Sequence, residues 1–125
     1  MKELVNNWFI KADNDLKTAE FGMTAEEPIT DTICFHCQQA VEKYLKAFIV
    51  YKGQIPGKTH NIAVLLRKCA QLDNSFLELS GIDHLTDYAV TLRYADGFYI
   101  PPVEEAEAAL EDAQRVKEFV ISKIK

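Results

Sequence analysis

The stretch Cys34–Gly53, CFHCQQAVEKYLKAFIVYKG, constrains the fold of this chain more than any other part of it. Placed on a helix together with the preceding Ile33, it carries a broad apolar arc made by Ile33, Cys34, Cys37, Val41, Tyr44, Leu45, Phe48 and Tyr51. The opposite side is mixed, because Phe35, Ile49 and Val50 lie among glutamines, glutamate and lysines. A surface helix normally has a cleaner polar face. We therefore predict a central helix, packed by its own bundle on one side and partly covered on the other, with a second subunit as one candidate cover.

The size and charge of the chain narrow the classes of protein to consider. With 125 residues it is expected to form one domain, residues 1–125, with a core of its own. No apolar run approaches the roughly 20 residues of a membrane span. The N-terminal residues lack the features of a signal peptide, and three cysteines fit a reducing compartment, so we expect a cytoplasmic protein without membrane contact. A net charge of −5 disfavours a nucleic-acid coat.

The charge is unevenly distributed along the chain. Residues 42–68 contain six basic residues and one acid, Glu42, whereas residues 103–125 contain six acids and four basic residues. A locally positive middle segment favours a small anionic ligand or an acidic partner.

The remaining segments show helical spacing. Apolar residues recur every three or four positions in 2–23, in 62–72 and from Pro102 nearly to the end, and a shorter stripe predicts a helix at about 83–94. Residues 76–79 fit a short helical turn. Thr30 or Asp31 is the expected N-cap of the central helix, and Thr59 or Asn61 that of the next. No segment alternates as a strand would. The sequence thus predicts an all-α fold, an up-and-down antiparallel bundle of four long helices plus a short helix.

Several segments in this order match a known family. They are ADNDLKTA after an early tryptophan, then CFHCQQAVEKYLKAFIVYKG, PGKTHNIAVLL and TLRYADGFY, followed by an alanine-rich acidic helix. Over essentially its whole length the chain resembles the HEPN domain, the "higher eukaryotes and prokaryotes nucleotide-binding" family. The resemblance implies a bundle of four or five helices that commonly forms a homodimer.

The resemblance also implies several functions. Many prokaryotic members look like partners of a small nucleotidyltransferase in a toxin–antitoxin pair. Others bind nucleotides or are purely structural. Some are metal-independent ribonucleases that use an arginine followed, after four to six residues, by a histidine. Arg93 stands where that arginine would fall, but no histidine follows it in the chain. We therefore expect no catalysis by the family mechanism. A ribonuclease with a degenerate site, in which Arg93 and His60 are the residues to suspect, is the alternative. Tyr99 or His84 could also replace the missing histidine, although any such replacement is a weaker hypothesis than loss of activity.

Five residues are candidates for binding a nucleotide or its phosphate. Arg93 offers a forked guanidinium, although an ion pair with Asp87 or Asp96 explains it equally well. Lys58 and His60 precede a helix N-terminus, which favours anions, but plain capping there is the simpler interpretation. Lys43 and Lys46 project from the central helix. Either these two lysines line a groove that binds a ligand, or they belong to a polar stripe that faces solvent.

The mixed face of the central helix supplies the candidates for a dimer interface: Phe35, Gln39, Ile49 and Val50. Cys34 and Cys37 form a CxxC, yet they lie on the apolar arc, and two further soft ligands at suitable spacing are missing. We interpret both as small buried side chains. No metal and no cofactor are expected. The leading hypothesis is a HEPN interaction module that dimerises through the central region and binds a nucleotidyltransferase, a nucleotide or both, without catalysing a reaction; RNA is a further candidate partner.

Overall fold

The computed structural model describes residues 2–90 and 98–124, and the described residues are helical with connecting loops. The α-helices are α1 (Lys2–Met23), α2 (Thr30–Tyr51), α3 (Ile62–Leu72), α4 (Asp87–Val90) and α5 (Val103–Lys123). Two 3₁₀ helices, η1 (Asn74–Leu79) and η2 (Asp83–Thr86), lie between α3 and α4. The predicted all-α bundle is confirmed. The helix predicted at 83–94 begins as η2 and continues as α4, and its last residues lie outside the described part of the chain.

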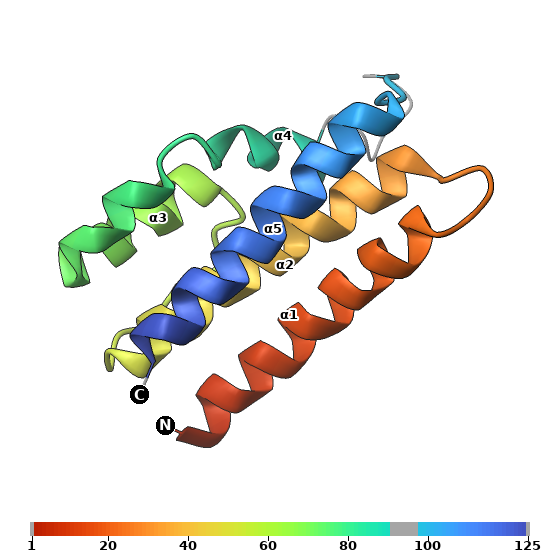
Figure 1. The fold of residues 1–125 in the computed structure, drawn as a ribbon. Helices are drawn as coiled ribbons and strands as arrows, with labels where there is room; N and C mark the ends of the chain where they lie inside the picture. Colours follow the sequence, from red (N-terminus) through yellow and green to blue (C-terminus); the bar gives the residue numbers. More distant parts are fainter. Residues whose placement is uncertain (1, 91–97, 125) are drawn as a thin grey trace.

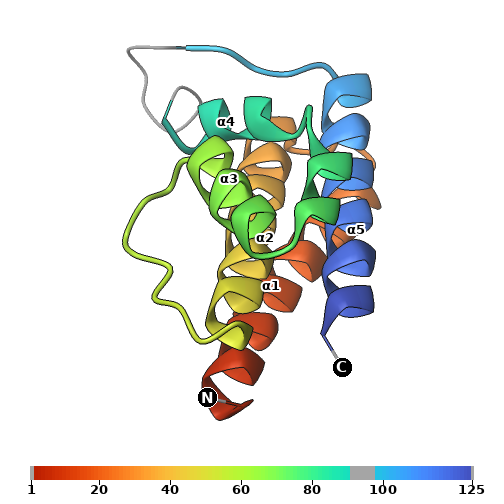
Figure 2. The ribbon, with the colours of Figure 1, turned by 90° about the vertical axis from the view of Figure 1, so that its left-hand side faces the viewer.

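Helix α2 lies at the centre of the bundle, as predicted. It packs against α1 along most of its length and also contacts α3, α4 and α5 (Figure 1). Figure 2 shows α1 and α5 on one side of α2, and α3 with α4 on the other. The largest fully buried side chains include Tyr44 and Phe48 of α2. Phe76 of η1 lies between Phe48 and Phe119, with ring centroids 4.3 and 5.0 Å away, and so connects η1 to α2 and α5.

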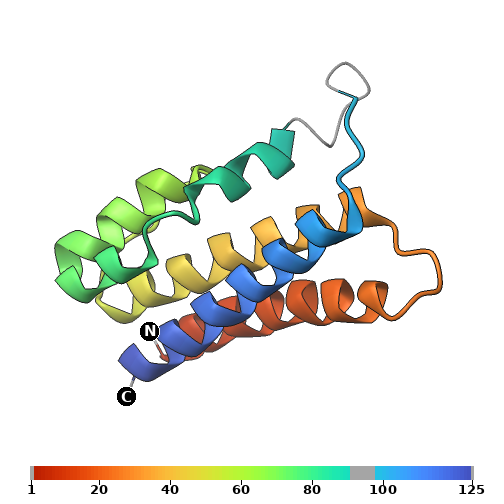
Figure 3. The same cartoon turned by 45° about the horizontal axis from the view of Figure 1, so that its top comes forward.

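Strict alternation of helix direction holds for α1 and α2 but not for the later long helices. Both α3 and α5 run in the same direction as α2 (Figure 3). Contacts along α3 agree with this: Gln38 bonds the carbonyl of His60 just before α3, and Cys69 near its end bonds the carbonyl of Leu45. The direction is the same because the 52–61 loop returns the chain toward the middle of α2 before α3 begins.

The helix ends explain part of the sequence. The predicted cap Asn61 is confirmed, since its Oδ1 accepts the Val64 N–H at 3.1 Å. The predicted cap at Thr30 or Asp31 is wrong, because α2 already begins at Thr30 with Ile29 at the cap position. The Thr30 hydroxyl instead donates to the carbonyl of Pro101, 2.6 Å away. This buried hydrogen bond fixes the start of α2 against the segment that leads into α5.

Candidate functional site

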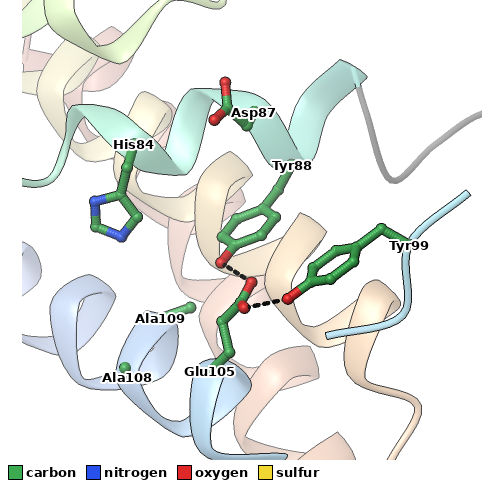
Figure 4. A pocket seen from close by; sticks show the side chains of 7 residues that line it. All are labelled: His84, Asp87, Tyr88, Tyr99, Glu105, Ala108 and Ala109. Atoms are coloured by element: carbon green, nitrogen blue, oxygen red, sulfur yellow. Dashed lines mark hydrogen bonds between the residues drawn. The ribbon is translucent and has the colours of Figure 1, made fainter. Parts of the chain in front are cut away.

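A pocket of about 410 Å³ lies between η2–α4 and the first turns of α5. It is lined by His84, Asp87, Tyr88, Tyr99, Glu105, Ala108 and Ala109. We call it the α4–α5 pocket. Its volume falls in the range of small-ligand sites. Ala108 and Ala109 leave the space open on the α5 side, because the stripe of small residues on this helix carries no long side chain there (Figure 4).

Two tyrosines share one carboxylate in this pocket. The Tyr88 hydroxyl donates to Glu105 Oε2 and the Tyr99 hydroxyl donates to Glu105 Oε1, both at 2.6 Å (Figure 4). Burial, and then the bond to Glu105, raise the pKa of Tyr88 well above its usual value. The bond to Glu105 is the main cause of the raised pKa of Tyr99. Glu105 therefore holds both rings as protonated, oriented walls of the pocket.

The imidazole of His84 forms the opposite wall. Its Nδ1 lies 2.6 Å from the carbonyl oxygen of Gly81, and because a carbonyl only accepts, Nδ1 carries the hydrogen. Its Nε2 faces Asp112 at 3.7 Å. Among the described residues, the lining holds the carboxylates of Asp87 and Glu105 and neither lysine nor arginine. The pocket suits a positively charged or hydrogen-donating group better than a phosphate.

A patch of apolar side chains lies at the same end of the bundle. It consists of Ile29, Phe98, Tyr99, Ile100 and Val103, which are 66%, 78%, 45%, 54% and 40% exposed. We call it the end patch. The hydrogen bond from Thr30 to Pro101 brings Ile29 beside the 98–103 segment. Tyr99 belongs to both the end patch and the α4–α5 pocket, so the two features are continuous.

The positively charged candidates do not form a phosphate site. The ammonium group of Lys43 pairs with Asp15 of α1, and that of Lys46 with Glu42 at 3.3 Å. Lys46 is 5% exposed on its side chain and also lies over the Trp8 ring, 5.5 Å from its centroid. Lys58 is exposed on the loop before α3. The structure thus separates these cations and satisfies two of them with carboxylates.

His60 and Arg93 cannot be joined into one site from the described residues. His60 Nδ1 lies 2.9 Å from Glu42 Oε1, and its side chain is 70% exposed. Gln38 completes this group, because its amide donates to Glu42 and to the His60 carbonyl. Arg93, the main candidate from the sequence, lies outside the described residues, as does Asp96. Asp87, its other proposed partner, lines the α4–α5 pocket.

The structure rules out two of the four residues that were predicted for the dimer interface. Ile49 and Val50 are only 1% and 3% exposed within the single chain, so neither is available to a second subunit. Val50 packs in a cluster with Val5 of α1 and Ala47, and Ile49 belongs to the main core. Phe35 and Gln39 remain partly exposed.

The cysteines are buried, as predicted. Cys34, Cys37 and Cys69 are each 0% exposed and are free thiols. Within residues 2–90 and 98–124, no three metal-ligating side chains gather. Likewise, the described helices include none that is both long and apolar enough to cross a membrane.

Sequence reasoning missed Tyr88 and Glu105 as pocket residues. In the sequence, Glu105 is one acid in an acidic run and Tyr88 is one apolar position of a helical stripe. The signal that points toward this pocket is Tyr99, an aromatic residue close to Arg93 in the sequence.

These features define a small helical-bundle domain built on one buried central helix, with a pocket and an apolar patch at one end. The model of the HEPN domain family matches residues 5–124, so the chain belongs to the HEPN domain family. The protein TT1696 from Thermus thermophilus superposes with a TM-score of 0.75 at 27% identity, covering 95% of this chain and 97% of that one. ST0689, an archaeal HEPN homologue, has a TM-score of 0.75 at 24% identity, covering 97% and 98%. No curated protein matches the chain.

Proposed function

We propose that this HEPN protein is an interaction module, which binds another protein through the end patch and catalyses no reaction itself. The observation that carries the proposal is the joint exposure of Ile29, Phe98, Tyr99, Ile100 and Val103. Scattered apolar residues are normal at a protein surface, whereas a contiguous group marks an interaction site. Phe98 and Ile100 are more than half exposed on a segment anchored through Pro101, so partner binding would bury them without rearranging the bundle.

The partner we propose is a small nucleotidyltransferase, in a pair of the toxin–antitoxin type. This proposal comes from the family resemblance, because many prokaryotic HEPN proteins look like partners of such an enzyme. The test is to establish whether the neighbouring gene encodes a small nucleotidyltransferase, to produce the two proteins together and to measure the mass of the purified complex by light scattering.

An Ile100→Ser variant of the patch should lose the partner while keeping the wild-type melting temperature, because the side chain is 54% exposed. Ile55→Ser is the matched control, since Ile55 is 87% exposed on the loop that follows α2, at the other end of the bundle (Figure 1). A complex that survives Ile100→Ser would overturn the role of the patch.

We further propose a homodimer that forms through the partly exposed end of the α2 face, with Phe35 and Gln39 at the interface. Gln39 already donates to Gln38 Oε1 at 2.7 Å, which leaves its own Oε1 as an acceptor toward a second subunit. The pure protein should then have the mass of two chains at micromolar concentration. Substituting Gln39 with arginine should shift it toward one chain; a wild-type mass of one chain would contradict the proposal.

Nucleotide or RNA binding is the second candidate function, and the exposed ring of Tyr99 beside the pocket favours it. Aromatic rings at a pocket mouth stack on nucleobases. Because the described lining residues include no lysine or arginine, the base or ribose would enter the pocket and the phosphates would point away from these residues. Millimolar ATP or GTP should raise the melting temperature of the wild type more than that of Tyr99→Ala. Equal or absent shifts would argue against this site.

A degenerate ribonuclease remains the alternative from another class. One observation favours it: His60 is exposed, and the buried Glu42 carboxylate orients its ring, an arrangement that can serve a general base. Cleavage of RNA by the pure protein, abolished in His60→Ala and in Arg93→Ala, would establish this activity. Cleavage that persists in both variants would instead indicate a contaminating nuclease.

A further inference from the structure

The end patch lies within a strongly acidic part of the surface. Two segments at this end of the bundle, residues 24–33 and 98–112, contain no lysine, arginine or histidine. They contain eight acids: Glu26, Glu27, Asp31, Glu104, Glu105, Glu107, Glu111 and Asp112. The Thr30–Pro101 hydrogen bond joins the two segments, and the 24–29 loop and the start of α5 lie at the same end of the molecule (Figures 1 and 3). An apolar surface with an acidic surround selects its partners by charge.

The α4–α5 pocket adds a specific acceptor at the edge of this surface. Asp87 is exposed on its rim, and Glu105 lies between the two tyrosine rings. A lysine or arginine side chain that enters here would meet two carboxylates, and the faces of Tyr88 and Tyr99 would stabilise its charge. The pocket is large enough for such a side chain.

We propose that the end patch and the α4–α5 pocket together receive a basic, amphipathic segment of a partner protein. Its apolar side chains cover Phe98, Ile100 and Val103, and one lysine or arginine enters the pocket beside Asp87 and Glu105. This inference rests on the proposed interaction function and adds the chemistry of the partner.

Other occupants fit this surface less well. A second copy of this chain, docked patch to patch, would bring the acids that surround the patch close to their own copies, and like charges across an interface cost affinity. The anionic surface of a membrane would be repelled in the same way. The negative charge at this end of the bundle therefore favours a basic polypeptide as the binding partner.

The test uses two synthetic peptides that share one helical leucine pattern and differ only in their polar positions, lysine in one and glutamate in the other. Binding to the full chain is measured by fluorescence anisotropy at low and at high salt. The lysine peptide should bind at least about tenfold more tightly than the glutamate peptide, and salt should weaken its binding.

Variants locate the contact. Ile100→Ser should weaken binding of the lysine peptide about tenfold, which is the size of effect expected for an apolar anchor. Asp87→Asn should weaken it severalfold. The matched controls, Ile55→Ser for the patch and Glu118→Gln for the charge, should leave it unchanged, because Ile55 is exposed on the loop after α2 and Glu118 is exposed near the other end of α5.

Either of two results would overturn the inference. Equal binding of both peptides, lost in Ile100→Ser, would keep the patch as an interface and so leave the proposed function standing, but would refute a basic partner. No binding of the lysine peptide would refute the inference outright, while the co-purification experiment still decides the proposed function.

Discussion

Glu42 and Lys46 form an ion pair inside the folded chain, with Glu42 Oε2 and Lys46 Nζ 3.3 Å apart and side chains only 4% and 5% exposed. The pair does not stand alone. Gln38 and His60 both contact the other carboxylate oxygen, and the Trp8 ring lies beside the ammonium group. Buried charges persist only when they are paired and hydrogen-bonded in this way. Hence the pair is a structural element of α2 and not a free phosphate-binding group.

Removing one member of this pair should destabilise the protein strongly. Glu42→Ala leaves the Lys46 ammonium buried without its anion, and we expect a loss of about 3–5 kcal/mol in the free energy of unfolding. The double variant Glu42→Gln, Lys46→Met removes both charges. Its free energy of unfolding should lie within about 1 kcal/mol of the wild-type value or exceed it. Urea unfolding measures the free energy of unfolding of the wild type and of each variant. The exposed Lys58→Ala is the control, and a loss below about 1 kcal/mol in Glu42→Ala would mean that the ammonium reaches water.

The thiols should be unreactive in the folded protein. Because Cys34, Cys37 and Cys69 are 0% exposed, Ellman's reagent should modify them no faster than the chain unfolds. In denaturant all three should react at once. Phe21→Cys supplies the positive control, because it adds an exposed thiol to the same fold. Rapid modification of any native cysteine would show that the bundle opens locally.

The long helices could be predicted from the sequence because the spacing of apolar residues within each segment is enough to identify it as a helix. The apolar stripes of 2–23, 62–72 and the last segment, together with Asn61 and the break at Gly53, locate α1, α3, α5 and the end of α2 without reference to the rest of the chain. Gly53 ends α2 with a φ of 80°, the left-handed conformation that glycine adopts at helix C-termini.

The mixed face of α2 could not be resolved in the same way. A glutamate and a lysine four residues apart read as a surface pair, and Ile49 and Val50 beside them read as exposed contacts. Whether that face is covered depends on Val5 and Trp8 of α1 and on His60 of a loop, all distant in sequence. The α4–α5 pocket has the same origin, since Tyr88 and Glu105 meet only when α4 packs beside α5. The periodicity of apolar residues describes one helix at a time and carries no information on contacts between residues of different helices.

Glu105 should control the ionisation of Tyr99. Because the hydrogen bond to this carboxylate is the main cause of the raised pKa of Tyr99, Glu105→Gln should lower that pKa toward its ordinary value near 10. Nuclear magnetic resonance of ring-labelled tyrosine follows the titration residue by residue. Glu104→Gln, an exposed neighbour in the same turn, should leave it unchanged. An unaltered pKa in Glu105→Gln would mean that the bond to Tyr99 is not formed in solution.

The buried thiols should also make the protein less stable in alkali. Burial raises the pKa of Cys34 and of Cys69 from 9.0 to about 12, and raises that of Cys37 as well. Between these two pH values the unfolded chain has released its thiol protons while the folded chain keeps them, so the unfolded state binds fewer protons. The free energy of unfolding must then fall as pH rises, by about 1.4 kcal/mol per pH unit for each thiol. The stabilisation is complete below about pH 9 and is lost as pH rises toward 12.

Urea unfolding between about pH 8 and pH 11 measures this slope. Cys69→Ala is the informative variant, because it removes one buried thiol that donates only to the Leu45 carbonyl at 3.5 Å. Its stability at neutral pH will fall through the cavity that it leaves, so the slopes are compared and not the absolute values. The free energy of unfolding of Cys69→Ala should fall less steeply with pH than that of the wild type, and the difference in slope should equal the contribution of one thiol. Equal slopes in the two proteins would mean that Cys69 ionises as readily in the folded chain as in the unfolded one, and would contradict its burial against α2.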